Sequence, residues 1–341
     1  MVWDNRIFVT SSEDQGLERA VHCFRRGDGK LLWTAKAPPT PPEPGVRDKN
    51  GYASSTPVTD GERVISFHGA SGIVCHDFDG NQLWHYPLPN IKTSHGIGSS
   101  PVLYKDLVIL AQDQNQGESV FLALNRKTGE KVWQGKRPKS MTWSTPVVVR
   151  IGERDELLFP GGEKLRSYDP NTGKELWTFS GPTVEVIPTL VVGRDLVYCA
   201  SGRNGPTIAM RPGRDAEGDI TSRSLVWRTA RTGPHVPSPI LVGDLLFTFG
   251  DSGVVSCLDA ETGLLIWQER LNDAFSASPL AAGDRIYAPG ESGVVHVLRA
   301  GRKLEVLAEN DLGEPILASL AAIDHQLVLR TPSQLVLIAK K

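Results

Sequence analysis

Apolar and polar residues alternate along short segments of this chain, and the clearest segment runs from Val254 to Leu258. It continues into Asp259-Ala260-Glu261-Thr262-Gly263, and a Trp follows four residues after the glycine. This pattern predicts a β-hairpin, because glycine adopts the positive φ that a tight turn needs. The tryptophan then caps the second strand with a large buried ring. Copies of the pattern, degraded to different degrees, end at Trp33, Trp84, Trp133, Trp177, Trp227 and Trp267.

Each repeat contains four short segments with strand character. The first begins with Ser, Thr or Pro, the second is strongly apolar, a Ser-Gly turn often precedes the third, and the Trp lies in the fourth. Successive Trp residues of the pattern are 40 to 51 residues apart. Four antiparallel strands in a unit of roughly 40–50 residues are typical of a β-propeller blade. No sustained period of about 3.6 residues is present, so we expect little helix.

The pattern predicts an all-β fold, an eight-bladed β-propeller of four-stranded antiparallel blades forming a single domain over residues 1–341. Residues 1–33 supply strands two to four of a blade with only the tail of the first. Residues 314–341 supply strands one to three, at 318–321, 326–329 and 334–339. Both ends contain strands two and three and therefore cannot share one blade, which favours eight blades over seven. The predicted blades span residues 1–37, 53–90, 97–137, 142–181, 185–231, 235–271, 275–310 and 315–341.

Three features depart from the regular repeat. A Pro-rich connection runs from Ala37 to Gly51, and residues 211–224 enlarge the hairpin before the fifth Trp. The last blade lacks its outer strand, which would leave an exposed sheet edge. We expect the missing strand upstream of Met1 and interpret Met1 as a fragment boundary.

Composition narrows the classes of partner. A net charge of −2 gives no electrostatic argument for nucleic acid or an anionic membrane. No apolar run reaches the roughly 18–20 residues of a membrane helix, and no signal peptide is visible.

The four cysteines form no C-x-x-C pair. Three of them share one repeat position, which predicts a small buried slot. We expect a monomer. The cysteines are Cys23, Cys75, Cys199 and Cys257.

The Asp-Ala-x-Thr-Gly-x-x-x-Trp hairpin and the Ser-x-Pro strand starts resemble the pyrroloquinoline-quinone-like (PQQ-like) repeat family of β-propellers, over essentially the whole chain. The segments 51–57 and 98–101 look like those of uncharacterised exported proteins of planctomycete-type bacteria. The resemblance implies a full-length protein that is exported, for example to the periplasm. It also implies one of two functions. Quinoprotein dehydrogenases bind PQQ and calcium, whereas a non-catalytic lipoprotein helps to assemble outer-membrane β-barrels, and fold does not choose between them.

A quinoprotein site needs an aromatic floor, basic partners for the carboxylates of PQQ, and oxygen ligands for calcium. Trp143 is a candidate for the floor, or equally for an aromatic plug at the rim of the pore. The chain has no adjacent cysteines and no clear Glu-Asn-Asp calcium set. We therefore expect no cofactor, with PQQ and calcium as the alternative.

The loops that lead from an outer strand to the next inner strand are the best location for a site, because they converge on one face. Two His and two acidic residues in these loops could form an acid/base or metal cluster, but they lie on separate blades, and a solvated rim is the simpler interpretation. The candidate binding residues are Tyr52, Lys92, His95, Trp143, Glu185, His235 and Asp273.

No other motif indicates chemistry. One blade holds His68, Cys75, His76 and His85, but their spacing is not that of zinc ligands. Nucleophile and phosphate-binding motifs are absent from the sequence, and the six repeat Trp are interpreted as blade packing. We therefore expect no catalytic residue and no metal site. The sequence favours a non-enzymatic binding module for a protein, peptide or saccharide partner, with a PQQ-dependent dehydrogenase as the alternative.

Overall fold

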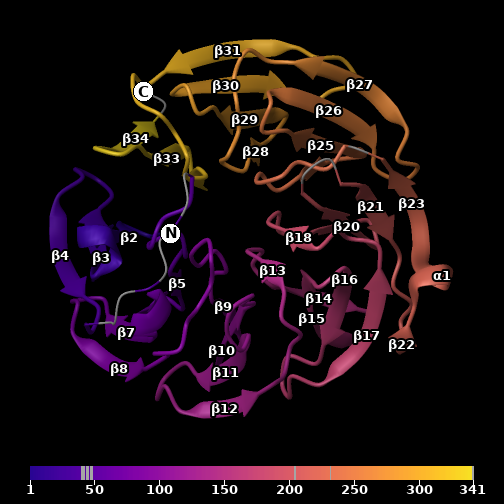
Figure 1. Cartoon of the computed structure of the whole chain (residues 1–341). Helices are drawn as coiled ribbons and strands as arrows, with labels where there is room; N and C mark the ends of the chain where they lie inside the picture. Colours follow the sequence, from indigo (N-terminus) through magenta and orange to yellow (C-terminus); the bar gives the residue numbers. More distant parts are fainter. Residues whose placement is uncertain (40–42, 44–45, 47–48, 203–204, 231, 340–341) are drawn as a thin grey trace. The chain divides into compact units, whose positions relative to one another are not determined.

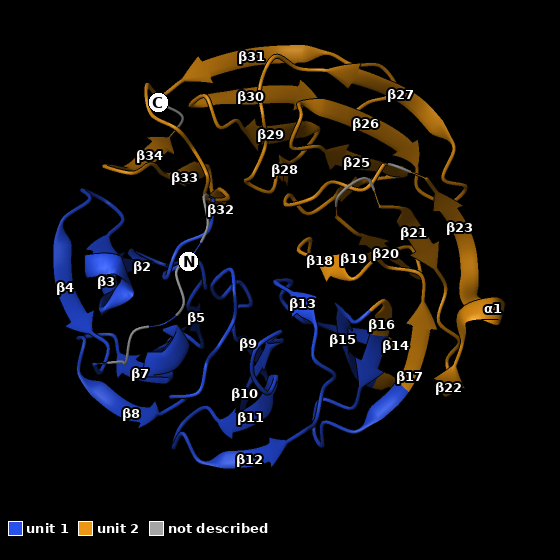
Figure 2. Cartoon of the chain, in the orientation of Figure 1, with its two compact units in different colours: residues 1–150, 155–162, 166–176 blue, residues 151–154, 163–165, 177–341 orange. Residues whose placement is uncertain are grey.

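In the computed structural model, each repeat of the chain forms a small sheet of its own (Figure 1). The structure describes residues 1–39, 43, 46, 49–202, 205–230 and 232–339. Much of the predicted Pro-rich connection therefore lies outside the described residues. The chain divides into two compact units, coloured separately in Figure 2. Unit 1 comprises residues 1–150, 155–162 and 166–176, and unit 2 comprises residues 151–154, 163–165 and 177–341.

Unit 1 contains three complete four-stranded antiparallel blades. Their strands are β1 (Val2–Trp3), β2 (Arg6–Glu13), β3 (Glu18–Arg25) and β4 (Leu31–Lys36); β5 (Val58–Thr59), β6 (Arg63–Phe67), β7 (Ile73–Asp77) and β8 (Gln82–Tyr86); and β9 (Val102–Tyr104), β10 (Leu107–Gln112), β11 (Val120–Asn125) and β12 (Lys131–Gln134). The short strand β13 (Met141–Thr142) follows. The division between the units falls in the fourth blade, which has β14 (Val147–Ile151), β15 (Arg154–Gly161), β16 (Lys164–Tyr168) and β17 (Glu175–Ser180).

Unit 2 continues with β18 (Glu185–Val186) and three more four-stranded blades. Their strands are β19 (Val191–Gly193), β20 (Leu196–Ala200), β21 (Thr207–Met210) and β23 (Leu225–Thr229); β24 (Ile240–Val242), β25 (Leu245–Phe249), β26 (Val254–Asp259) and β27 (Leu265–Arg270); and β28 (Leu280–Ala282), β29 (Arg285–Pro289), β30 (Val294–Arg299) and β31 (Val306–Asp311). The eighth blade has three strands, β32 (Ala321–Ile323), β33 (Gln326–Arg330) and β34 (Leu335–Ala339). The predicted all-β, eight-bladed fold is confirmed.

The repeat tryptophans explain how neighbouring blades join. In unit 1 the Trp84 ring lies against the turn glycine of the next blade, since a Cβ at Gly129 would lie 2.7 Å from its Cδ2 atom. Its indole N–H donates to the carbonyl of Arg126, 3.1 Å away. In unit 2 the Trp227 ring packs on Gly263 in the same way and donates to the Ala260 carbonyl at 2.9 Å. The Trp therefore connects its own outer strand to the following blade.

The slot shared by three cysteines has a simple origin in the sheet register. The slot residue pairs directly with the Trp of the fourth strand, as Cys75 does with Trp84 and Ala123 with Trp133. A register shift follows in both blades. A small side chain leaves room for the indole opposite it. All four cysteines are free and buried.

Some details differ from the sequence-based expectations. The sequence predicts the first strand of the last blade at 318–321, but β32 covers Ala321–Ile323. The enlarged hairpin contains a short strand, β22 (Gly218–Asp219), which pairs in parallel with β17, so the strands of this fold are not all antiparallel. It also contains the four-residue helix α1 (Thr221–Ser224). Other helical structure in the described residues is limited to two 3₁₀ turns, Asp14–Gly16 and Gly69–Ser71, and none of the described helices has the length and apolar character to cross a membrane.

Candidate functional site

Two of the predicted binding residues in unit 1, His95 and Trp143, lie together. Their rings are perpendicular, with centroids 5.8 Å apart. The Trp143 indole N–H donates to the Gly96 carbonyl at 3.0 Å, and the side chain leaves no room for a Cβ at Gly98. Both rings are half-buried. The backbone of the glycine-rich segment 96–98 thus holds Trp143 in one orientation while part of the ring stays accessible.

Polar side chains surround this pair. Asn50 donates to the carbonyls of His95 and Ile97, at 2.5 and 3.0 Å. Ser94 Oγ lies 2.7 Å from His95 Nδ1 and accepts a hydrogen bond from Asn115 Nδ2 at 2.7 Å. We call Asn50, Ser94, His95, Asn115 and Trp143 the Trp143 surface.

The other two candidates in unit 1 have different surroundings. Tyr52 stacks on the Arg19 guanidinium, 5.2 Å from its ring centroid, and packs against Gly16. Arg19 itself forms a buried ion pair with Glu43, at 2.8 Å. Tyr52 therefore contributes to packing at the end of the Pro-rich connection. Lys92 is exposed, and its backbone N–H bonds to Gln114 Oε1.

A fully buried ion pair fixes the segment that leads to Trp143. Arg137 donates from Nε and Nη2 to the two carboxylate oxygens of Asp113, at 2.7 and 2.8 Å, and from Nη1 to Tyr168 Oη at 2.5 Å. Burial alone would lower the pKa of Arg137, but the Asp113 carboxylate raises it above its ordinary value. The Arg137 guanidinium therefore keeps its charge in the interior of unit 1, paired with Asp113.

In unit 2 the structure brings Glu185 and His235 together. His235 Nε2 lies 3.7 Å from Glu185 Oε2, and both side chains are partly exposed. The His235 backbone N–H donates to Asp251 Oδ2 at 3.0 Å. The His235 ring also lies against Gly202. The pair is a loose, solvent-accessible contact.

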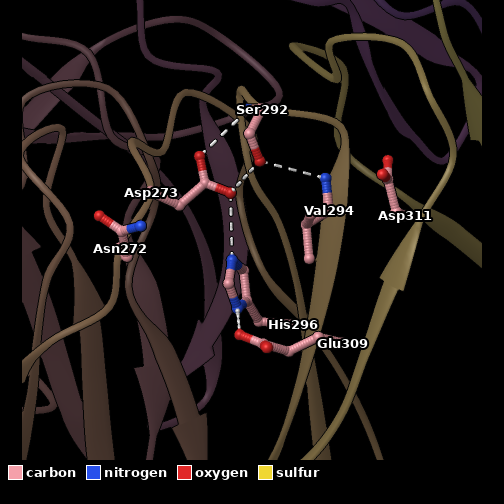
Figure 3. Close-up of a pocket in the computed structure, with 7 residues that line it drawn as sticks. All are labelled: Asn272, Asp273, Ser292, Val294, His296, Glu309 and Asp311. Atoms are coloured by element: carbon pink, nitrogen blue, oxygen red, sulfur yellow. Dashed lines mark hydrogen bonds and ion pairs between the residues drawn. The ribbon is translucent and has the colours of Figure 1, made fainter.

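Asp273 belongs to a separate pocket of about 290 Å³ on the seventh blade, lined by Asn272, Asp273, Ser292, Val294, His296, Glu309 and Asp311 (Figure 3). We call it the His296 pocket. Asp273 comes from the loop after β27, Ser292 from the turn between β29 and β30, His296 from β30, and Glu309 and Asp311 from β31.

His296 lies between two carboxylates. Its Nε2 atom is 3.1 Å from Asp273 Oδ2, and its Nδ1 atom is 3.1 Å from Glu309 Oε1 (Figure 3). The His296 and Asp273 side chains are 4% and 3% exposed, whereas that of Glu309 is 60% exposed. The pocket therefore has a buried histidine floor and a solvent-accessible acidic wall.

Donors from the protein occupy both oxygens of Asp273. Oδ1 accepts from the backbone N–H groups of Ala274 and Ser292, at 2.8 and 3.1 Å, and Oδ2 accepts from Ser292 Oγ at 2.6 Å. Burial by itself would raise the pKa of Asp273, but these hydrogen bonds and that from His296 lower it below its ordinary value. Asp273 is therefore a carboxylate that anchors its loop to the blade.

Sequence reasoning found Asp273 but missed the rest of the pocket. One available signal was His296 itself, a polar residue within the apolar third-strand run 294–298. The cross-strand pairing of His296 with Glu309 depends on the register of β30 and β31, which the repeat pattern alone did not fix.

The histidines of the second blade are structural. His68 Nε2 lies 2.8 Å from Ser66 Oγ, and burial lowers the pKa of His68 to about 3. Burial also lowers the pKa of His76 to about 4. Nowhere in the described ranges do three or more His, Cys, Asp or Glu side chains form a group that could hold a metal ion.

Comparisons with known proteins give consistent results for the fold. The profile of the PQQ-repeat family described as outer membrane protein assembly factor BamB matches residues 17–215 and 216–303. No curated protein sequence matches the chain. Among solved structures, BamB from Moraxella catarrhalis is 17% identical with a TM-score of 0.67, and the alignment covers 96% of this chain and 95% of that one.

Two enzymes share the fold at lower identity. A europium-containing methanol dehydrogenase is 12% identical with a TM-score of 0.71, covering 97% of this chain and 80% of the enzyme. Quinohemoprotein alcohol dehydrogenase from Comamonas testosteroni is 12% identical with a TM-score of 0.72, covering 96% of this chain and 69% of the enzyme.

Proposed function

The chain belongs to the PQQ-like repeat β-propeller family, and from this premise we propose that it is a non-enzymatic module that binds a protein or peptide through the Trp143 surface. The relative described as an outer membrane protein assembly factor supports a polypeptide partner and a periplasmic or otherwise exported location.

The observation that carries the proposal is the arrangement around Trp143. A half-buried Trp held by a backbone hydrogen bond loses little conformational freedom when a partner covers it. Trp is enriched among residues that dominate binding energy, usually inside a polar rim. Asn50, Ser94 and Asn115 supply such a rim, and the exposed Lys92 lies beside it in sequence.

The alternative is a PQQ-dependent dehydrogenase, supported by the shared fold of the two enzymes. Trp143 and Lys92 could contribute to a quinone site. Both carboxylate oxygens of Asp273, a candidate calcium ligand, already accept hydrogen bonds from the protein. We prefer the binding module because the side chains placed around Trp143 are amide, hydroxyl and imidazole groups, which suit the polar rim of a polypeptide-binding surface.

The test is a selection of displayed random peptides on the immobilised protein, followed by titration of one synthetic selected peptide. Trp143→Ala should weaken binding about 30-fold or more, the equivalent of about 2 kcal/mol for a dominant interface residue. Val132→Ala, at an outer-strand side chain that is 52% exposed, is the matched control and should change affinity less than twofold.

Equal affinities for Trp143→Ala and Val132→Ala would contradict the proposal. Retention of PQQ and Ca²⁺ through gel filtration, with dye-linked alcohol oxidation, would establish the alternative. Selective binding to a glycan array with no peptide selected would identify a saccharide ligand instead.

A further inference from the structure

One short segment of the third blade contacts both of the chain segments that form the Trp143 surface. It is Gln112-Asp113-Gln114-Asn115, which begins at the last residue of β10. We call it the 112–115 segment. The turn after β10 runs over residues 113–119, whereas the equivalent turns of two blades in unit 2 span only residues 250–253 and 290–293. The third blade therefore carries a longer turn than the repeat requires.

The 112–115 segment is polar but largely buried. Gln112, Asp113 and Gln114 are 0%, 2% and 1% exposed. Buried amide and carboxylate groups cost free energy unless they form hydrogen bonds. Side chains this deep do not reach a partner at the surface, so their role depends on the protein groups that they hold.

The 112–115 segment holds residues 92–98 by hydrogen bonds to three of their backbone N–H groups. The pairs of donor and acceptor are Lys92 N–H with Gln114 Oε1, Ser94 N–H with Asn115 Oδ1 at 3.2 Å, and Gly98 N–H with Gln112 Oε1 at 3.3 Å. Gly96 lies between the last two of these anchors, and its carbonyl accepts the Trp143 indole N–H at 3.0 Å. The path of residues 92–98 therefore sets the orientation of the Trp143 ring.

The same segment also anchors the second half of the Trp143 surface. Asp113 forms the buried ion pair with Arg137, in which both carboxylate oxygens accept hydrogen bonds. A second link passes through Ser119 Oγ, which accepts from the Gln114 backbone N–H at 3.2 Å and donates to the Pro138 carbonyl at 3.0 Å. One segment thus connects the two halves of the surface.

We propose that Gln114 is a positioning residue of the Trp143 surface. Its Oε1 atom accepts from the Lys92 N–H and its Nε2 atom donates to the Glu118 carbonyl, so both ends of the amide are engaged. Gln114 thereby keeps residues 92–98 in the conformation that holds the Trp143 ring before a partner arrives. Such preorganisation reduces the entropic cost of binding. The inference rests on the proposed function only for its effect on peptide binding.

The experiment labels the full chain with fluorotryptophan and records fluorine NMR spectra without a ligand. Trp143→Phe assigns the Trp143 signal. Gln114→Met keeps the approximate size of the side chain but removes both of its hydrogen bonds, so the Trp143 signal should shift by more than its linewidth while the other Trp signals stay in place. Asn125→Leu is the matched control, because it removes two hydrogen bonds to backbone N–H groups in the outer turn of the same blade, and it should leave the Trp143 signal unchanged.

Two further measurements complete the test. Asn115→Ala, at a half-buried side chain, removes the neighbouring anchor at Ser94 and should also shift the Trp143 signal, which keeps the test available if Gln114→Met does not fold. Titration of the selected peptide should give about tenfold weaker binding for Gln114→Met, as expected for the loss of buried hydrogen bonds that order the site. Asn125→Leu should change affinity less than twofold.

An unshifted Trp143 signal in folded Gln114→Met or in Asn115→Ala, or equal shifts in Gln114→Met and Asn125→Leu, would overturn the inference. Shifts of all Trp signals in Gln114→Met would also overturn it, because they would show a general structural role. A shifted Trp143 signal in Gln114→Met, together with a wild-type chain that binds no peptide, would refute only the proposed function.

Discussion

The joint between blades can be tested by a pair of glycine substitutions in unit 1. Gly129 and Gly29 occupy equivalent hairpin turns, with φ of +74° and +70°. Each backbone N–H donates to the carbonyl four residues earlier, at 2.8 and 2.9 Å. They differ in one respect. A Cβ at Gly129 would lie 2.7 Å from Trp84 Cδ2, whereas a Cβ at Gly29 has nothing within 4 Å.

The expected magnitudes follow from this geometry. Alanine in the left-handed region costs about 1–2 kcal/mol, and both variants should lose this amount. Gly129→Ala additionally displaces the indole, and overpacking in a close-packed core costs about 1–3 kcal/mol. Displacement of the indole would also weaken the hydrogen bond from Trp84 to the Arg126 carbonyl, which contributes about 1 kcal/mol. Gly129→Ala should therefore be less stable than Gly29→Ala by about 1–3 kcal/mol.

Guanidinium unfolding followed by far-UV circular dichroism and Trp fluorescence measures the difference. Because Gly29→Ala carries the backbone strain without the steric clash, the comparison isolates the contact with the indole. Equal free energies of unfolding for the two variants would refute the argument that the Trp–Gly contact joins the blades.

Three further predictions concern the buried ion pair of Arg137, the pH dependence of stability and the reactivity of the thiols. Arg137→Ala leaves the Asp113 carboxylate buried without its partner and should cost about 3–5 kcal/mol in urea unfolding, against less than about 1 kcal/mol for the exposed Arg150→Ala. Because the folded pKa of His68 is about 3, the unfolded chain binds the extra proton between about pH 6.5 and 3. The free energy of unfolding should therefore fall as the pH is lowered across this window. His68→Gln should reduce the slope of the free energy of unfolding against pH by about 1.4 kcal/mol per pH unit. The same slope in both proteins would contradict the buried neutral imidazole. The native protein should resist iodoacetamide at pH 8 and react only after unfolding, because burial raises the thiol pKa to about 12 at Cys75, Cys199 and Cys257; rapid native labelling would disprove this.

The repeated part of the fold was predictable because the same residue pattern, with a turn glycine and an outer-strand Trp, recurs in successive blades. Gly129 and Gly263 have positive φ, as their place in the hairpin predicted. Cys75 and Ala123 share a slot because each pairs with a Trp. These features depend on contacts within one blade or between neighbouring blades, which sequence spacing encodes directly.

The candidate sites were predictable only in part, because they depend on side chains that no repeat specifies. Proximity of His95 to Trp143 follows from the path of segment 94–98, and the pairing of Glu185 with His235 joins loops about fifty residues apart in sequence. The His296 pocket depends on the register of β30 and β31 and on a loop that follows the preceding blade. The residues that contact Asp273 could therefore not be predicted from its position in the sequence.

Hydrogen–deuterium exchange with and without a selected peptide tests the central claim most directly, because it locates a bound polypeptide on the chain. The account predicts slower exchange in residues 92–98 and 140–145, around Trp143, and unchanged exchange in the outer strand 131–134. Protection confined to other segments, or no protection at peptide concentrations that saturate binding, would contradict the assignment of the Trp143 surface as the polypeptide-binding site.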